Sequence, residues 1–261
     1  MRLPIYQVDA FTDTLFGGNP AAVVLMQDYP ADDVLLAIAQ ENNLAETAYL
    51  VPQGDDYQLR WFTPLLEVPL CGHATLASAA VVMERLRPQL DQLVFHTLSG
   101  PLTVRRDGQY YSLDLPARPV QQRADDPALE KILGARPLEL WANEAACLAV
   151  LETEQQVREL RPDLRALACS GWDACIVTAA GTDGFDFVSR FFAPGHGVDE
   201  DPVTGSAHCA LVPFWAHRLG KERFLAYQAS ARGGVLECHL LGERVQLRGQ
   251  AVFYLEGSIM V

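Results

Sequence analysis

Alternating apolar and polar positions, rich in β-branched and aromatic residues, recur along much of the chain and predict many β-strands. Asp107-Gly108 lies between two such segments and predicts a hairpin turn, because these residues favour tight turns. The segments with the strand pattern are IYQVDAF (5–11), AAVVLM (21–26), TAYLVP (47–52), YQLRWFT (57–63), LVFHTL (93–98), PLTVRRDG (101–108) and YYSLDLP (110–116).

Other segments repeat their apolar positions at helical spacing and predict helices. Gly220 closes the last of them, as expected of a residue that ends a helix in the left-handed conformation. Strands in hairpins outnumber strand–helix–strand units, which favours an α+β fold with mostly antiparallel sheets. The predicted helices are PADDVLLAIAQENN (30–43), HATLASAAVVMERL (73–86), DPALEKILG (126–134), TEQQVRELRPDLRAL (153–167) and SAHCALVPFWAHRLG (206–220).

One stretch of the sequence is echoed about 130 residues later. RWFTP (60–64) precedes CGHATLASAA (71–80), and RFFAP (190–194) precedes TGSAHCALVP (204–213). A short apolar pattern can recur by chance, but the matched order of three features favours duplication. The echo predicts two similar halves, each with a strand that leads through a loop into an apolar helix.

The two echoed helices carry apolar residues on all faces, so we expect protein to surround each of them. The first N–H groups of a helix lack partners within it and carry partial positive charge. Gly72 and Gly205 would let a ligand approach these groups without a Cβ in the way. Such helix starts suit a carboxylate or an enolate-like oxygen. His73 and Ser206 follow the two glycines and would be pseudo-symmetric partners.

Acidic residues near these positions add candidate chemistry. Asp199 and Glu200 fit a solvated acidic turn. Asp201 precedes a proline, which favours an extended backbone and a fixed side chain near Ser206. Glu46, in the apolar segment LAETAYL, is either an exposed edge-strand residue or a partly desolvated acid suited to proton transfer.

Composition narrows the class of protein. The 261 residues are 49% hydrophobic and carry a formal charge of −13, which disfavours binding to nucleic acid. No basic amphipathic stretch, signal-peptide pattern or run of about 20 apolar residues indicates a membrane. We expect a cytoplasmic protein with reduced thiols. The cysteines are Cys71, Cys147, Cys169, Cys175, Cys209 and Cys238.

Two other site types find little support in the sequence. Cys71 and His73 could form a nucleophile and base, but no residue that would orient the histidine is identifiable. The histidines show no ligand spacing of the H-E-x-x-H kind, so no metal is expected. His208 is expected to face the surroundings of its helix, and His196 could reach the active site. His96, His217 and His239 fit ordinary surface or strand positions.

Four blocks and the end of the chain together resemble the PhzF-like isomerase family of phenazine biosynthesis. The resemblance implies the diaminopimelate-epimerase-like fold, with two pseudo-symmetric domains that each wrap a mostly antiparallel sheet around a central helix. It places one domain at residues 1–117 plus 250–261, the other at 118–249, and the active site in the cleft between them. The blocks are YQVDAFTDTLFGGNPAAVVL, NLAETAYL, RWFTPLLEVPLCGHATLASA and DEDPVTGSAHCAL, with LRGQAVFYLEGSI at the end.

The resemblance also implies an activity: isomerisation by proton transfer without a cofactor, on a small carboxylate-bearing metabolite, commonly by a homodimer. Glu46 would be the general acid/base. The resemblance therefore favours the partly desolvated acid over the exposed edge-strand residue. His73, Asp201 and Ser206 would assist it. The residues expected to bind substrate or shape the pocket are Gly18, Asn19, Gly72, Thr204 and Gly205.

One departure from the wider fold limits the chemistry. Related racemases and epimerases oppose two cysteines, whereas here Cys71 is matched by Thr204. A single thiol cannot run two-base inversion, so isomerisation through one carboxylate is favoured. An epimerase or racemase and a non-catalytic binding protein remain the alternatives. The substrate is not fixed by the sequence.

Overall fold

A computed structural model describes residues 2–261 and divides the chain into two compact units. Unit 1 contains the chain up to Leu115 together with Gln246–Val261, and unit 2 is Pro116–Val245. Among residues 2–261, no helix combines the length and the apolar character needed to cross a membrane.

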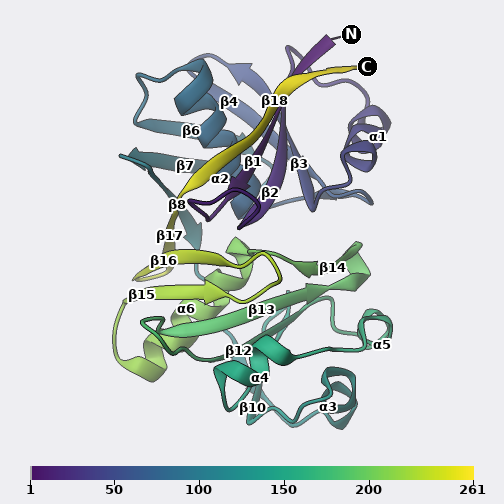
Figure 1. The fold of residues 1–261 in the computed structure, drawn as a ribbon, viewed down its shortest axis with the longest axis vertical. Helices are drawn as coiled ribbons and strands as arrows, with labels where there is room; N and C mark the ends of the chain where they lie inside the picture. The colour runs from purple at the N-terminus through teal and green to yellow at the C-terminus, as the bar shows by residue number, and fades with distance from the viewer. Residues whose placement is uncertain (1) are drawn as a thin grey trace. The chain divides into compact units, whose positions relative to one another are not determined.

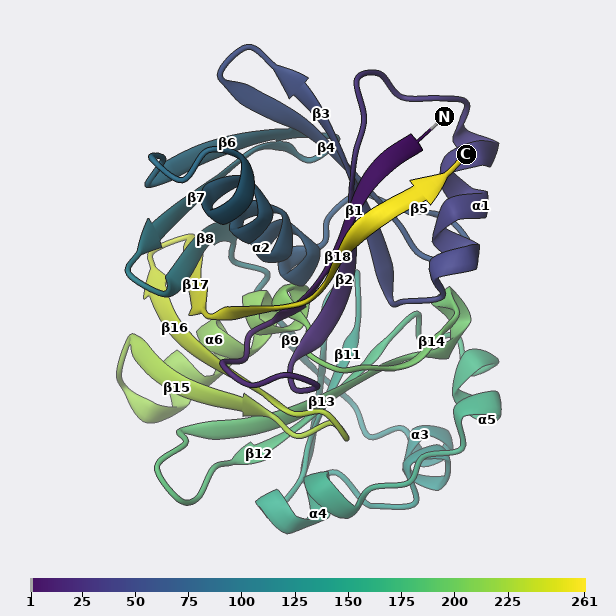
Figure 2. The ribbon, with the colours of Figure 1, turned by 45° about the horizontal axis from the view of Figure 1, so that its top comes forward.

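The strands of unit 1 pair in the order β18-β1-β2-β3-β4-β6-β7-β8, and β5 pairs with β4. Only β2–β3 and β4–β6 are parallel. The terminal strands β1 and β18 lie side by side (Figures 1 and 2). The strands are β1 (Arg2–Ala10), β2 (Asn19–Leu25), β3 (Glu46–Gln53), β4 (Asp56–Phe62), β5 (Glu67–Val68), β6 (Gln92–Thr97), β7 (Gly100–Asp107), β8 (Tyr110–Pro116) and β18 (Ala251–Met260).

Unit 2 repeats this arrangement. Its strands pair in the order β9-β10-β11-β12-β13-β15-β16, β14 pairs with β13, and β11–β12 and β13–β15 are parallel. The expected α+β fold of two pseudo-symmetric, mostly antiparallel units is confirmed. The strands are β9 (Gln121–Arg123), β10 (Glu139–Ala142), β11 (Cys147–Val150), β12 (Cys175–Ala180), β13 (Phe187–Ala193), β14 (Val198–Asp201), β15 (Arg223–Gln228) and β16 (Gly234–Leu241); β17 (Arg244–Gly249) crosses the division between the units.

Helix α2 (Gly72–Val81) is the central helix of unit 1, and all of its residues are buried, as its apolar faces predict. It contacts β1, β2 and β3 and continues into one π-helical turn at Val82–Leu86 (Figure 2). Helix α1 (Asp32–Asn42) covers a second core built with β3 and its neighbours. Because strand side chains alternate between faces, Glu46 points to the face opposite that core.

Helix α6 (Gly205–Leu219) takes the corresponding place in unit 2 (Figure 1). Its first turns are buried, but its last turn is exposed, so the expectation of protein on every side is wrong for this end. His217 and Arg218 explain the difference, because basic side chains at a helix C-terminus favour water and the negative end of the helix dipole. Gly220 ends the helix with φ 65°, as predicted.

The segment 153–167 forms two short helices, α4 (Glu154–Glu159) and α5 (Leu164–Ala168), and the single predicted helix is wrong. Pro162 breaks it, because a proline ring disfavours helical backbone at the preceding residue. The helix predicted at 126–134 forms as α3 (Pro127–Leu133). The predicted turn joins β7 to β8, with φ 60° at Gly108.

Candidate active site

The start of α2 gathers the candidate residues of unit 1. Cys71 caps the helix with extended backbone, Gly72 begins it and His73 follows with only 2% of its surface exposed. Thr75, one turn on, donates its hydroxyl to the Cys71 carbonyl oxygen at 2.5 Å. A side chain of the helix itself therefore holds the backbone at Cys71 in place.

Three side chains surround the His73 ring. Its Nε2 lies 3.3 Å from Glu46 Oε2, and its Nδ1 lies 3.0 Å from Asn19 Nδ2 and 3.5 Å from Cys71 Sγ. Burial lowers the pKa of His73 to about 3, so the ring is neutral at physiological pH. The contact with Glu46 thus joins a carboxyl group to a neutral imidazole, and is not an ion pair.

Asn19 determines which ring nitrogen carries the proton. An amide nitrogen can only donate, so His73 Nδ1 accepts from Asn19 and the ring proton is on Nε2. That nitrogen lies 3.3 Å from Glu46 Oε2, with an alignment outside hydrogen-bond geometry. Catalytic contacts often tighten only when substrate is bound.

Glu46 is the first residue of β3, and 15% of its side chain is exposed. The exposed edge-strand interpretation is therefore wrong, and the partly desolvated acid is what the fold provides. Glu46, Cys71 and His73 also offer ligand atoms within 4.8 Å of one another. In the tautomer that Asn19 favours, the His73 nitrogen that faces Glu46 carries a proton. A metal held by these three residues would require the other tautomer of His73.

Gly18 shapes the loop that leads to Asn19. Its φ is +59°, and a Cβ there would lie 2.1 Å from the Ala10 carbonyl oxygen. Only glycine fits such a position without strain. Asn19 is fully buried against His73. Direct contact of Gly18 or Asn19 with a substrate stays a prediction.

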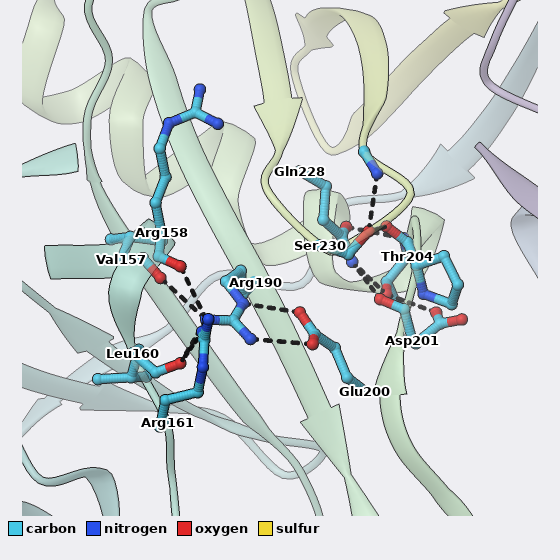
Figure 3. Close-up of polar contacts among 12 residues, drawn as sticks. Val157, Arg158, Leu160, Arg161, Arg190, Glu200, Asp201, Thr204, Gln228 and Ser230 are labelled. Carbon is cyan, nitrogen blue, oxygen red and sulfur yellow. Dashed lines mark hydrogen bonds and ion pairs between the residues drawn. The ribbon is translucent and has the colours of Figure 1, made fainter. Parts of the chain in front are cut away.

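The start of α6 and the turn before it carry the candidates of unit 2, of which Figure 3 shows Asp201 and Thr204. Thr204 caps the helix and donates its hydroxyl to Asp201 Oδ2. Asp201 is buried, whereas Ser206, on the first turn, is partly exposed. One turn on, His208 Nδ1 donates to the Thr204 carbonyl oxygen at 2.8 Å, and burial lowers the pKa of His208 to about 4. His208 is fully buried on α6, where its ring lies near Phe187.

Glu200 does not lie in a solvated turn, and that prediction is wrong. Its carboxylate accepts two hydrogen bonds, 2.7 and 2.9 Å long, from the buried guanidinium of Arg190 (Figure 3). Arg60 makes the same paired contact with Glu67 in unit 1, at 2.7 Å for each bond. The sequence echo aligns Arg60 with Arg190 and Glu67 with Glu200, so this contact could have been predicted from it. Asp199 is exposed, as expected.

Two further polar side chains hold the loop before α6. Gln228 makes three hydrogen bonds to Asp201 and Thr204, and Ser230 donates to the Pro202 carbonyl oxygen at 2.8 Å. No sequence motif marks either residue. His196 lies exposed in the short turn Pro194–His196.

The profile of the family described as "Phenazine biosynthesis-like protein" matches residues 8–257. The chain belongs to this family. An uncharacterized isomerase of Pseudomonas aeruginosa is 48% identical over 99% of both chains, and one of Halalkalibacterium halodurans is 46% identical over 100% of both. The human phenazine biosynthesis-like domain-containing protein is 39% identical over 99% of both chains.

Solved structures agree with the assignment of the chain to this family. A PhzF-family protein of Enterococcus faecalis is 42% identical, covers 100% of both chains and superposes with a TM-score of 0.95. A probable proline racemase of Agrobacterium radiobacter shares the fold, with a TM-score of 0.69 at 11% identity over 99% of this chain and 93% of its own. The family and fold expected from the sequence are confirmed.

Equivalent positions of the two units carry side chains of different chemistry. The registers β3–β4 and β12–β13 place Ala174 where unit 1 has Glu46. The pairings Trp61–Val68 and Phe191–Asp201 place Asp201 where unit 1 has a valine. His73 is likewise matched by Ser206. The carboxylate beside an imidazole therefore occurs only once among these equivalent positions.

Proposed function

We propose that this isomerase moves a proton between two carbon atoms of a small carboxylate-bearing metabolite, with Glu46 as the general acid and base and without a cofactor. The observation that carries the proposal is the partly buried Glu46 beside the neutral His73 at the start of α2. A carboxylate in such surroundings can take up and return a proton within one turnover.

The chemistry needs no other reactant. The Glu46 carboxylate removes a proton from carbon, and the C–H electron pair moves into the conjugated system of the substrate. The protonated Glu46 side chain then returns the proton to a different carbon of the substrate. The net result is a shifted C–H bond and double bond, with no atom gained or lost.

The His73 Nε2–H supports this cycle. Once Glu46 has returned the proton to the substrate it is a carboxylate again, and a hydrogen bond from His73 stabilises that negative charge. A neutral imidazole does not compete for the transferred proton. We propose that backbone N–H groups at Gly72 and Gly205 bind developing negative charge, and that Asp201, Thr204 and Ser206 contact the substrate. That the residues of unit 1 and those of unit 2 act on the same substrate molecule stays a prediction.

The asymmetry of the two units favours isomerisation over racemisation. Inversion by two opposed bases needs a base from each half of the fold. Unit 2 has Ala174 in place of Glu46 and Thr204 in place of Cys71, and neither side chain is a base; its carboxylate, Asp201, stands at a different position, equivalent to Val68. This supports one base that both removes and returns the proton.

The test is solvent exchange in deuterium oxide with a panel of aromatic and aliphatic carboxylates, read by mass spectrometry. An isomerase should incorporate deuterium into a carbon of one member. The substitution Glu46→Gln should slow incorporation by a factor of about 10² to 10⁴, the usual contribution of a general base. Glu41→Gln, the same change at an exposed position, should leave the rate unaltered.

Three results would contradict this function. Absence of exchange with every carboxylate, together with a rise in melting temperature for one of them, would favour a binding protein. Exchange that survives Glu46→Gln but not Cys71→Ala would assign the chemistry to the thiol. Label only at a stereocentre, with inversion and no double-bond shift, would favour an epimerase.

A further inference from the structure

Gln228 is the last residue of β15 and is fully buried. Its backbone lies opposite Ser189 in the parallel pair of β15 with β13. A buried amide must find hydrogen-bond partners, because leaving it without them destabilises the folded state. All the partners of this side chain given by the structure are in the turn that leads into α6.

The three contacts leave no ambiguity in the orientation of the amide. Gln228 Oε1 accepts from the Thr204 N–H at 2.8 Å, and Nε2 donates to the Asp201 carbonyl oxygen at 2.7 Å and to Thr204 Oγ1 at 3.0 Å (Figure 3). Since Thr204 Oγ1 accepts from the amide, its own proton is directed to Asp201 Oδ2. Gln228 thus fixes both ends of the turn and the direction of the hydroxyl between them.

Unit 1 shows which contacts this loop needs for folding alone. In both units a serine hydroxyl donates to the carbonyl oxygen of the proline in the loop before the central helix. Ser99 binds Pro69 at 2.6 Å in unit 1, and Ser230 binds Pro202 at 2.8 Å in unit 2. This shared contact belongs to the fold.

The contacts of Gln228, unlike that of Ser230, are not repeated in unit 1. The parallel pairs β4–β6 and β13–β15 match it with Thr97 of unit 1. Thr97 donates to the Gly100 carbonyl oxygen at 2.7 Å, within its own hairpin. The contacts of Gln228 are therefore additional to the common framework, and they are made at Asp201 and Thr204, two residues that distinguish unit 2.

We propose that Gln228 is a positioning residue, which holds the Asp201–Gly205 turn and the Thr204 hydroxyl in the arrangement the reaction requires. The proposal rests on the proposed function for the role of Asp201 in turnover. Gln228 itself acts through Asp201 and Thr204 and is not assigned a contact with substrate.

Two substitutions separate the functions of the amide. Gln228→Leu removes acceptor and donor together. Gln228→Glu keeps an oxygen that accepts from Thr204 N–H, but it loses donors: a carboxylate cannot donate at all, and a carboxylic acid can donate to only one of Asp201 and Thr204. Thr178→Val is the matched control, because Thr178 is a buried residue of unit 2 whose two hydrogen bonds lie on Val188 and Trp215, away from the turn.

The first measurement uses the free protein and needs no substrate. Amide hydrogen exchange by NMR should show the Thr204 N–H exchanging at least about tenfold faster in Gln228→Leu, relative to the amides of β13. In Gln228→Glu this amide should stay protected. Thr178→Val, adjusted for its melting temperature, should leave it unchanged. Equal protection of Thr204 in wild type and Gln228→Leu would overturn the proposal.

The second measurement uses the panel carboxylate into which the wild-type protein incorporates deuterium. Both Gln228 variants should lower kcat about tenfold or more with KM within about threefold, whereas Thr178→Val should change neither. Unchanged kcat in both variants would overturn the positioning role. If no panel member exchanges with wild type, the proposed function and the catalytic role of Gln228 fail together, while the free-protein result still decides whether the turn depends on this amide.

Discussion

The two buried histidines make stability depend on pH in a range where few other groups titrate. His73 and His208 have a pKa of about 3 and about 4 in the folded protein, against 6.5 for an unperturbed imidazole, and burial is the main cause for both. In the unfolded chain both rings bind a proton below pH 6.5. Between pH 6 and 5 the unfolded state therefore holds more protons, and acidification destabilises the fold.

The size of the effect follows from proton counts. At pH 5.5 about nine-tenths of unfolded imidazoles are protonated, and the two buried rings are neutral when folded. The free energy of unfolding should then fall by roughly 2 to 3 kcal/mol for each pH unit, half of it from each histidine. Carboxyl groups of the unfolded chain titrate mainly below this range.

Urea denaturation at intervals between pH 5 and 6 measures this slope. His208→Asn should halve it, because an asparagine amide can still donate to the Thr204 carbonyl oxygen but does not titrate. His96→Asn is the control, since 44% of the His96 side chain is exposed. A wild-type slope near zero, or one that His208→Asn leaves unchanged, would refute the assignment of neutral buried rings.

Two further predictions concern the support of His73. Nitrogen-15 NMR should show the ring proton of His73 on Nε2 and that of His208 on Nδ1, and Asn19→Asp should reverse the His73 tautomer; a His73 proton on Nδ1 in the wild type would contradict the orientation of the Asn19 amide. Gly18→Ala places a Cβ 2.1 Å from a backbone oxygen of β1 at φ +59°, and should lower the free energy of unfolding in urea by more than about 2 kcal/mol. Gly108→Ala has a similar φ but no atom within 4 Å, so it should cost about 1 kcal/mol; equal losses for the two would show that the close contact is relieved.

Local patterns were enough to predict most of the secondary structure of unit 1. Period-two alternation located seven of its strands, whereas most strands of unit 2 were not predicted one by one; Gly220 located the end of α6. The one broken helix has its cause in the sequence, since Pro162 stands in its middle. Patterns of this kind act over a few residues, which is why they carry over from sequence to structure so directly.

Contacts between distant residues were harder to predict. The echoed helix start singled out His73, family resemblance assigned Glu46, and their 3.3 Å contact depends on the packing of α2 against β3. Arg190 and Glu200 were predictable from the echo, had the acidic residues been compared with those of the first half. Gln228 was not, because a lone glutamine at a strand end carries no motif and its partners are 24 and 27 residues away.

The repeat of one arrangement in the two units separates contacts that the fold requires from contacts that serve the chemistry. A contact present in both units is explained by folding alone. An example is the hydrogen bond from a serine hydroxyl to the carbonyl oxygen of the proline in the loop before the central helix. A polar residue present in one unit where the other has an apolar one needs a different explanation, since the framework does not require it. Glu46 against Ala174, and Asp201 against Val68, are of this second kind. Gln228 binds Asp201 at the second of these positions. We therefore propose that Glu46, Asp201 and Gln228 mark the positions at which the two halves differ for the sake of the reaction.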